Sequence, residues 1–175
     1  MDTMRVVLFR HGPAGERDAT RWPDDDLRTL SPRGETRTRA AAAGLARLVG
    51  DVREIWTSPL ARCQASAALL REACPGAKRV TVDALRPGGS WREIIEKLRA
   101  GRREGTIVLV GHEPDLGNLA GSLVFGAPRA MPLKKAGACA VDFGRDVEAG
   151  KGEIAWLLTP KVLRSLDRQK KEKAR

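Results

Sequence analysis

The sequence lacks several features that would place it in a specialised class of protein. Its 175 residues contain no apolar run close to the ~18 residues that a membrane span needs. Residues 1–9 show none of the basic, apolar and small-residue stages of a secretory signal. No internal repeat, linker or low-complexity block divides the chain. We therefore expect one cytoplasmic domain of ordinary size that has no contact with a membrane.

Cysteine and histidine are also scarce. The three cysteines, Cys63, Cys74 and Cys139, are odd in number and form no C-x-x-C pair, which argues against a disulfide framework or a structural zinc site. We expect three reduced, partly buried thiols. The only histidines are His11 and His112, and neither belongs to an H-x-x-x-H pair or to a cluster of carboxylates. We therefore expect no metal ion and no other cofactor.

Positive charge gathers at the C-terminal end of the chain. The net charge is +10, and residues 161–175 contain seven basic and two acidic side chains. We predict a domain over residues 1–160 and a basic tail over residues 161–175. Such a tail can contact a polyanion, although it is more often a solvated end that aids solubility. Its charges are not interleaved with aromatic residues, so it does not indicate a surface for stacking bases.

Apolar runs that favour strands alternate along the chain with segments that favour helices. Strands are predicted near residues 5–9, 52–56, 80–85, 106–110, 137–143 and 153–158, and helices near residues 32–49, 60–73, 91–100 and 115–124. Ser31 and Pro32 mark the start of the first helix, and Gly50 marks its end. The alternating order predicts an α/β fold, a three-layer α/β/α sandwich around a mostly parallel central sheet.

Both histidines directly follow a predicted strand. Because ligands of open α/β sheets bind at the carboxyl ends of the strands, His11 and His112 are expected to meet in one crevice. Arg10 precedes His11, and Arg62 lies at the start of the helix after the second strand. The planar guanidinium group fits phosphate oxygens, and these four side chains have no evident carboxylate partners. They predict a site for an anionic substrate, since adjacent arginines would repel a metal ion.

Three short motifs match a known family. Arg10-His11-Gly12 follows the first predicted strand, Ser58-Pro59-Leu60-Ala61-Arg62 begins a helix, and Gly111-His112 follows a late strand. With the motifs in this order, the chain resembles the histidine phosphatase superfamily, also called the phosphoglycerate-mutase-like family, over about residues 4 to 158. The resemblance implies the phosphoglycerate-mutase-like fold and a phosphatase that needs no metal, with residues 1–160 as its histidine phosphatase domain.

Within that superfamily the chain looks most like the SixA-type phosphohistidine phosphatases. The stretches that support this are Arg21–Asp26, Leu30–Gly34 and Gly111–Leu116. The mutase and acid-phosphatase branches carry a helical insertion after the arginine motif, whereas only 20 residues separate Arg62 from Asp83 here. A single compact domain without a helical cap is therefore implied. An open site of this kind suits a phosphorylated side chain on another protein.

The resemblance also implies a role for each site residue. His11 would attack phosphorus and form a covalent phosphohistidine that water then hydrolyses, while His112, Arg10 and Arg62 would stabilise charge on the phosphoryl oxygens. Many family members place a carboxylic acid after the third strand to protonate an alcohol leaving group. Ala84 aligns with that acid, as in SixA-type members, which lack the usual acid. Asp83 is adjacent but should point the opposite way on a strand.

Three functions remain open on this evidence. The first is a SixA-type phosphatase that removes phosphate from phosphohistidine of a protein. The second is a general small-molecule phosphomonoesterase with Asp83 or Glu113 as the acid. The third is a non-catalytic module that binds phosphorylated or polyanionic partners through the Arg/His pocket and the basic tail. The intact His11 argues against the third, because a binding module needs no nucleophile.

Overall fold

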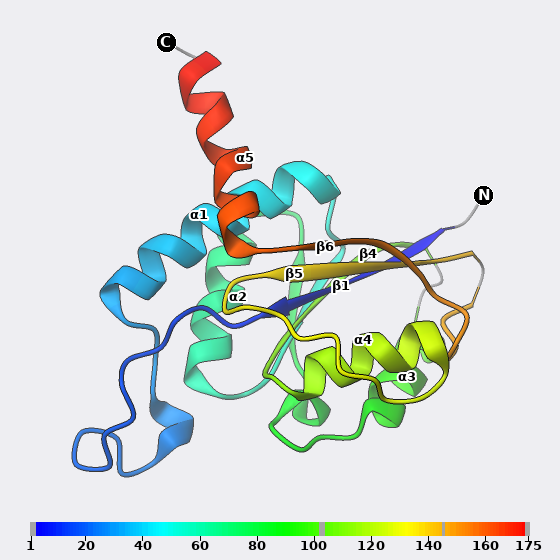
Figure 1. Ribbon diagram of the computed structural model, residues 1–175, viewed down its shortest axis with the longest axis horizontal. Coiled ribbons are helices and arrows are strands. Elements are labelled where there is room, and N and C mark those ends of the chain that lie inside the picture. Colours follow the sequence, from blue (N-terminus) through cyan, green and yellow to red (C-terminus); the bar gives the residue numbers. More distant parts are fainter. Residues whose placement is uncertain (1–2, 102–103, 145, 174–175) are drawn as a thin grey trace.

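A computed structural model describes residues 3–101, 104–144 and 146–173, and it describes side chains as far as residue 167. Its centre is a six-stranded sheet in the order β3-β2-β4-β1-β5-β6 (Figure 1). The strands are β1 (Met4–Arg10), β2 (Glu54–Thr57), β3 (Lys78–Thr81), β4 (Gly105–Gly111), β5 (Ala138–Phe143) and β6 (Glu153–Leu158). Neighbouring strands from β3 to β1 are parallel, whereas β5 is antiparallel to both β1 and β6. The predicted mostly parallel sheet is confirmed.

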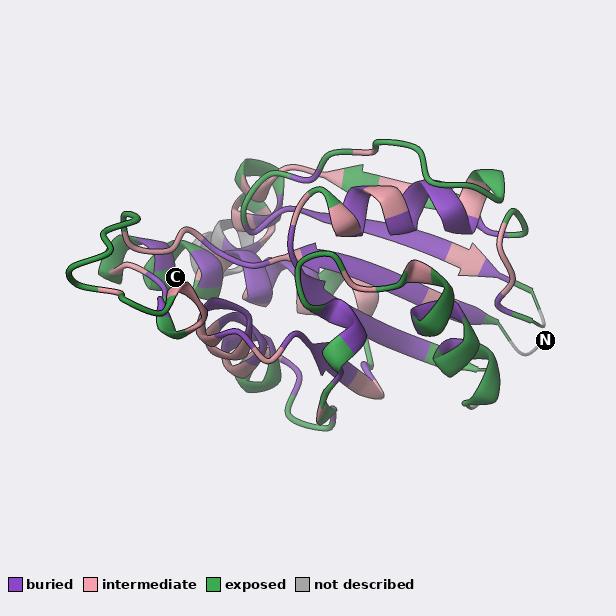
Figure 2. Ribbon diagram, turned by 90° about the horizontal axis from the view of Figure 1, so that it is seen from below, coloured by how far each residue is buried: buried purple, intermediate pink, exposed green. Residues whose placement is uncertain are grey.

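Helices cover both faces of the sheet. They are α1 (Pro32–Val49), α2 (Ala61–Ala73), α3 (Trp91–Ala100), α4 (Asp115–Phe125) and α5 (Pro160–Lys173), with two 3₁₀ turns, η1 (Asp25–Leu27) and η2 (Asp83–Leu85). Val6 and Leu8 of β1 pack in one apolar cluster with α3 and α4, while Val7 and Phe9 pack in a second cluster with α1, α2 and α5. Figure 2 shows the buried strands between helices that are exposed on their outer sides. This is the predicted three-layer sandwich.

Helix α1 begins and ends where its sequence predicts. The Ser31 hydroxyl accepts a hydrogen bond from Gly34 N at 3.0 Å, Pro32 occupies the first helical position, and Gly50 follows the last turn with a φ of 67°. A serine cap satisfies an N–H group that the helix itself leaves without a partner, and glycine adopts positive φ without strain. These local signals explain why both ends of this helix were predictable.

The third predicted strand is shorter than its apolar pattern indicates. Strand β3 ends at Thr81, and the residues expected to continue it form the 3₁₀ turn η2, in which Leu85 N donates to Val82 O at 3.1 Å. The prediction of a strand as far as residue 85 was wrong because Ala84 and Leu85 are buried in the cluster formed with α3 and α4, not by pairing within the sheet. A short buried turn and a strand produce similar apolar runs.

The predicted basic tail begins inside a packed helix. Leu163 of α5 is fully buried against α1, and its backbone oxygen would lie 1.8 Å from a Cβ atom built on Gly44. Arg47 of α1 donates to Leu166 O at 2.9 Å. The boundary predicted between residues 160 and 161 therefore lies within α5, and Leu163 of this helix belongs to the core. The basic residues of the predicted tail from Arg168 onward lie beyond the last residue whose side chain the structure describes. In the part of the chain that the structure covers, no helix is long and apolar enough to cross a membrane.

Candidate active site

The two histidines meet at the carboxyl edge of the sheet. Strands β1 and β4 are parallel neighbours whose register pairs Arg10 with Gly111, so the residue after each strand reaches the same place. His11 N donates to Gly111 O at 3.1 Å, and the two imidazole rings lie 5.2 Å apart between centroids. The structure thus brings His11 and His112 side by side at one edge of the sheet, as their positions after two strands predict.

The His11 ring is held in one orientation by the backbone of the next residue, Gly12. Its Nδ1 atom lies 2.7 Å from Gly12 O, and because a carbonyl only accepts, Nδ1 carries the proton. The lone pair is therefore on Nε2. Burial is the main cause that lowers the pKa of His11 to about 3; the nearby His112, Arg62 and Arg10 contribute to this shift, and the Gly12 contact opposes it. At neutral pH the ring is neutral, as a nucleophile must be.

The loop after β1 depends on glycine at position 12. A Cβ atom at this position would lie 1.8 Å from Thr38 Oγ1 of α1. Gly12 N also donates to Ser66 Oγ at 3.0 Å, and Ser66 in turn donates to Arg62 O at 2.8 Å. The loop that positions His11 is therefore fixed to the helix that carries Arg62.

His112 is held by its Nε2 edge. Nε2 lies 2.9 Å from Ser58 Oγ and 3.3 Å from Cys63 Sγ, and all three side chains are buried. Burial lowers the pKa of His112 to about 4, with a further contribution from Arg62. Ser58 belongs to the predicted arginine motif, but neither it nor Cys63 was predicted to contact a histidine. Their contacts join residues about 50 positions apart, which no local pattern reveals.

The thiol of Cys63 is not set up as a nucleophile. Its burial raises its pKa to about 12, so the sulfur stays protonated at neutral pH. Cys74 and Cys139 are also buried and free. We expected three reduced, partly buried thiols, and the structure shows all three free and more fully buried than expected. Cys63 packs against the His112 ring.

Arg62 has an acidic neighbour that the sequence did not reveal. Its Nη1 atom donates to Asp25 O at 2.9 Å and lies 3.3 Å from Asp25 Oδ2. The expectation that the site arginines have no carboxylate partner is wrong for this residue. Asp25 belongs to η1, in the loop between β1 and α1, and the acidic run from Asp24 to Asp26 was the only sequence signal available. Arg62 itself is buried beside the two histidines and contributes to lowering the pKa of both.

Arg10 is positioned by the loop between α4 and β5. Its Nη1 atom donates to Leu133 O at 2.8 Å, and its Nε atom is buried without a partner among the described residues. Glu113 supports the same loop, because its Oε1 atom accepts a hydrogen bond from Leu133 N at 3.2 Å. Burial raises the pKa of the Glu113 carboxyl. Glu113 thus braces the segment that holds Arg10 and does not line the pocket beside His112.

The position predicted for a general acid contains an alanine that lines this pocket. Ala84 is buried and borders the same cavity as His112, whereas the Asp83 side chain is 86% exposed and lies 3.6 Å from Arg86. Asp83 points away, as predicted, but the reason given for it was wrong, since both residues belong to the turn η2 and not to a strand. In the turn, successive side chains also point in different directions.

The assembled site has the chemistry of an oxyanion receptor. Two guanidinium groups and two neutral imidazoles converge at one edge of the sheet, where a tetrahedral anion would receive several hydrogen bonds. Among the described residues, no group of three or more histidine, cysteine, aspartate or glutamate side chains is placed to hold a metal ion. The metal-free site expected from the sequence remains a prediction for experiment.

Comparison with known proteins identifies a family and a relative that this chain matches in sequence. The model of the histidine phosphatase superfamily (branch 1) matches residues 6–93, which include Arg10, His11 and Arg62. An uncharacterised protein of Picosynechococcus sp. is 35% identical over 165 residues, covering 91% of this chain and 99% of that protein.

Solved structures share the fold at lower identity. The protein histidine phosphatase SixA complexed with tungstate superposes with a TM-score of 0.78 at 22% identity, covering 91% of this chain and 99% of that one. A putative phosphohistidine phosphatase SixA from Agrobacterium tumefaciens superposes with a TM-score of 0.70 at 19% identity, covering 89% of this chain and 97% of that one. A mycobacterial glucosyl-3-phosphoglycerate phosphatase superposes with a TM-score of 0.66 at 18% identity, covering 90% of this chain and 99% of that one.

Proposed function

This chain belongs to branch 1 of the histidine phosphatase superfamily, and on that premise we propose that it removes phosphate from phosphohistidine of a protein. The family match and the oxyanion site both support phosphatase activity. The observation that carries the proposal is the His11 ring, whose Nδ1–H is bound to Gly12 O so that Nε2 keeps its lone pair. His112, Arg62 and Arg10 lie close enough to the ring to help lower its pKa.

In the proposed reaction His11 Nε2 attacks phosphorus in line with the bond that breaks. The N–P bond forms on His11 as the P–N bond to the substrate imidazole breaks, and the electron pair of that bond stays on the departing ring. Arg10, Arg62 and His112 stabilise the charge on the equatorial oxygens. Water then attacks the phosphohistidine on His11, which releases inorganic phosphate and restores the neutral imidazole. No step requires a metal ion.

The preference for phosphohistidine rests on two features. Ala84 occupies the position at which a general acid would serve an alcohol leaving group, and an imidazole leaves without such an acid more readily than an alkoxide. The chain between Arg62 and Asp83 contains only the rest of α2 and β3, with no helical cap. The SixA structures that share this fold are described as protein histidine phosphatase and phosphohistidine phosphatase.

A small-molecule phosphomonoesterase is the alternative, supported by the same fold in the mycobacterial glucosyl-3-phosphoglycerate phosphatase. The test is to measure kcat/KM for a phosphohistidine protein, an aryl phosphate and an alkyl phosphate, with and without chelator. The proposal expects the order phosphohistidine, then aryl phosphate, then alkyl phosphate, unchanged by EDTA. Equal activity on the alkyl ester would favour the alternative, and loss of activity in EDTA would refute a metal-free mechanism.

A further inference from the structure

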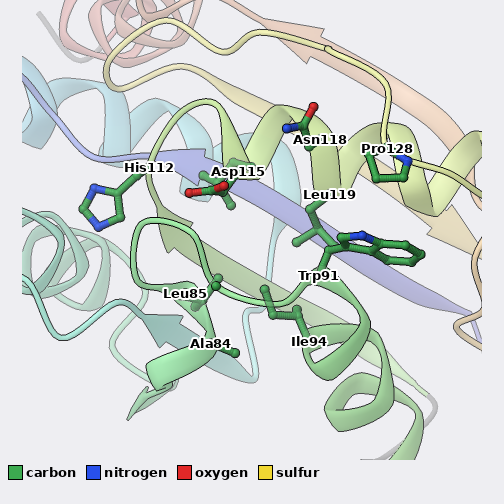
Figure 3. A pocket seen from close by; sticks show the side chains of 11 residues that line it. Ala84, Leu85, Trp91, Ile94, His112, Asp115, Asn118, Leu119 and Pro128 are labelled. Carbon is green, nitrogen blue, oxygen red and sulfur yellow. The ribbon is translucent and has the colours of Figure 1, made fainter.

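A small cavity opens directly beside His112. Its volume is about 80 Å³, several times the ~10–15 Å³ that one water molecule needs. Its apolar wall is built from Ala84, Trp91, Ile94 and Leu119, which come from η2, α3 and α4. Figure 3 shows His112 at one end of this hollow and the Trp91 ring at the other. The cavity therefore adjoins the site of the two histidines on the side of His112.

One carboxylate stands at the His112 end of this cavity, whose lining is mostly apolar but also includes Asn118. Asp115, the first residue of α4, lines the cavity, and Figure 3 shows its carboxylate pointing toward His112. Its Oδ2 atom accepts a hydrogen bond from Gly88 N at 2.9 Å, which fixes the side chain. Its Oδ1 atom has no hydrogen-bond partner among the described residues. An acceptor is thus held at the junction of the cavity and the phosphoryl site.

On the basis of the phosphatase function above, we propose that this cavity is the subsite for the leaving group, and that Asp115 accepts a hydrogen bond from the ring N–H of a departing imidazole. The apolar wall suits a flat ring, and the carboxylate complements a ring that carries an N–H group. Asp115 is therefore a specificity-determining residue for nitrogen heteroaromatic leaving groups. A phenyl ring would fit the same wall without using the carboxylate.

The charge of Asp115 favours the required protonation state of the substrate. When the ring nitrogen distant from phosphorus holds a proton, the breaking P–N bond leaves its electron pair on the nearer nitrogen and the product is neutral imidazole. A nearby carboxylate stabilises the protonated, cationic ring before the bond breaks. A general acid makes an alcohol a better leaving group by protonating it, and the contact with Asp115 favours the protonated form of a departing imidazole in the same way. A pocket with Ala84 at the acid position can therefore still favour an imidazole as the leaving group.

The test compares three leaving groups with the same phosphoryl group. A phosphohistidine peptide has a ring with an N–H group, 4-nitrophenyl phosphate has a ring without one, and phosphoramidate has no ring. Asp115→Asn should lower kcat/KM for the phosphohistidine peptide by about 10- to 100-fold, the range for one hydrogen bond to a charged group, and change the other two by less than about threefold. Trp91→Ala should lower kcat/KM for both ring substrates and spare phosphoramidate.

Two controls separate this role from a structural one. Asparagine retains an oxygen that can accept from Gly88 N, so Asp115→Asn preserves the contact with the loop before α3. Glu93→Gln removes one negative charge from an exposed site on α3 and should leave all three substrates unchanged. Equal losses on all three substrates in Asp115→Asn would assign Asp115 to folding or helix capping, and no loss on phosphohistidine would equally overturn the proposal.

The same assay distinguishes failure of this inference from failure of the proposed function. His11→Ala is assayed in parallel, and retained turnover in that variant would refute the histidine mechanism whatever Asp115 does. Loss of only aryl phosphate turnover in Asp115→Asn would assign Asp115 to the ester substrate, which contradicts the inference while leaving the phosphatase function intact.

Discussion

Asp25 contacts Arg62 through both its backbone oxygen, at 2.9 Å, and its carboxylate, at 3.3 Å. A negative charge therefore lies against one of the two arginines proposed to bind phosphate. The Asp25 carboxylate is half exposed and also pairs with Arg28 at 2.7 Å. An incoming oxyanion must share Arg62 with this carboxylate.

We expect Asp25→Asn to bind oxyanions more tightly than the wild type. A half-exposed ion pair is typically worth about 0.2–1 kcal/mol, which predicts a Kd for tungstate or phosphate that is lower by about 1.4-fold to fivefold. Calorimetry, or inhibition of aryl phosphate hydrolysis, measures this. Asp18→Asn is the matched control, since Asp18 lies in the same loop and its carboxylate accepts from the backbone N–H groups of Thr20 and Arg21. Weaker binding by Asp25→Asn would show instead that Asp25 holds Arg62 in its binding position.

Stability should fall in mild acid because two histidines are buried in neutral form. The pKa values of His11 and His112 are about 3 and about 4 in the folded chain, against 6.5 for an ordinary histidine. Between pH 6.5 and 4 the unfolded chain binds more protons, so the free energy of unfolding decreases as the pH falls, by up to about 1.4 kcal/mol per pH unit for each histidine.

Denaturant unfolding at several pH values between 7 and 4 measures this slope. His11→Ala removes one of the two titrating groups and should therefore show a shallower loss of stability than the wild type over the same range. An identical slope in both proteins would mean that His11 does not titrate with a lowered pKa in the folded state.

The C-terminal helix should stabilise the domain through one buried leucine. Leu163→Ala is expected to cost about 2–5 kcal/mol of the free energy of unfolding, because the side chain is fully buried against α1. Val162→Ala, at a neighbouring position that is 41% exposed, should cost much less. Removal of residues 168–175 should leave hydrolysis of a small substrate unchanged, whereas removal from Lys161 should destabilise the fold. Equal stability of the two truncations would contradict the packing of α5.

A carboxyl group placed at position 84 should improve hydrolysis of alkyl phosphates. General acid catalysis contributes about 10²–10⁴-fold, and part of this, about 10-fold in kcat/KM, is expected for Ala84→Glu because the position lines the pocket beside His112. Ala84→Gln has nearly the same shape without an acid and should show no gain. Melting curves confirm that both variants fold.

The phosphomonoesterase hypothesis assigns the role of general acid to Asp83 or Glu113, whereas our account gives neither residue that role. Asp83→Asn should change little, since the Asp83 side chain faces solvent beside Arg86. Glu113→Gln should act on both phosphohistidine and ester substrates, through the Leu133 loop that holds Arg10. If either variant instead removed only the ester activity, that residue would be the acid, and the phosphomonoesterase reading would replace ours.

Local signals were sufficient for most of the fold. The ends of α1 follow from Ser31, Pro32 and Gly50, which act on neighbouring backbone groups. The meeting of His11 and His112 follows from the rule that parallel strands end at one edge of the sheet. The turn η2 was misassigned because burial against α3 and α4 gives the same apolar pattern as a strand.

Long-range contacts could not be predicted from the sequence. The pairing of Arg62 with Asp25 and the contact of Cys63 with His112 join residues 37 and 49 positions apart, and they depend on how loops and helices meet in space. Helix α5 was predicted as a basic tail because its charges dominate its composition, whereas its packing depends on Leu163 and on the close approach that Gly44 allows.

The central claim, that His11 carries the phosphoryl group, is tested most directly by trapping the intermediate. The enzyme is mixed with a phosphohistidine peptide, quenched under alkaline denaturing conditions that preserve phosphohistidine, digested, and mapped by mass spectrometry. We predict one phosphoryl group on the peptide that contains His11, formed within a single turnover and absent from His11→Ala. Undiminished turnover by His11→Ala, or a phosphoryl group found only on another residue, would contradict the account.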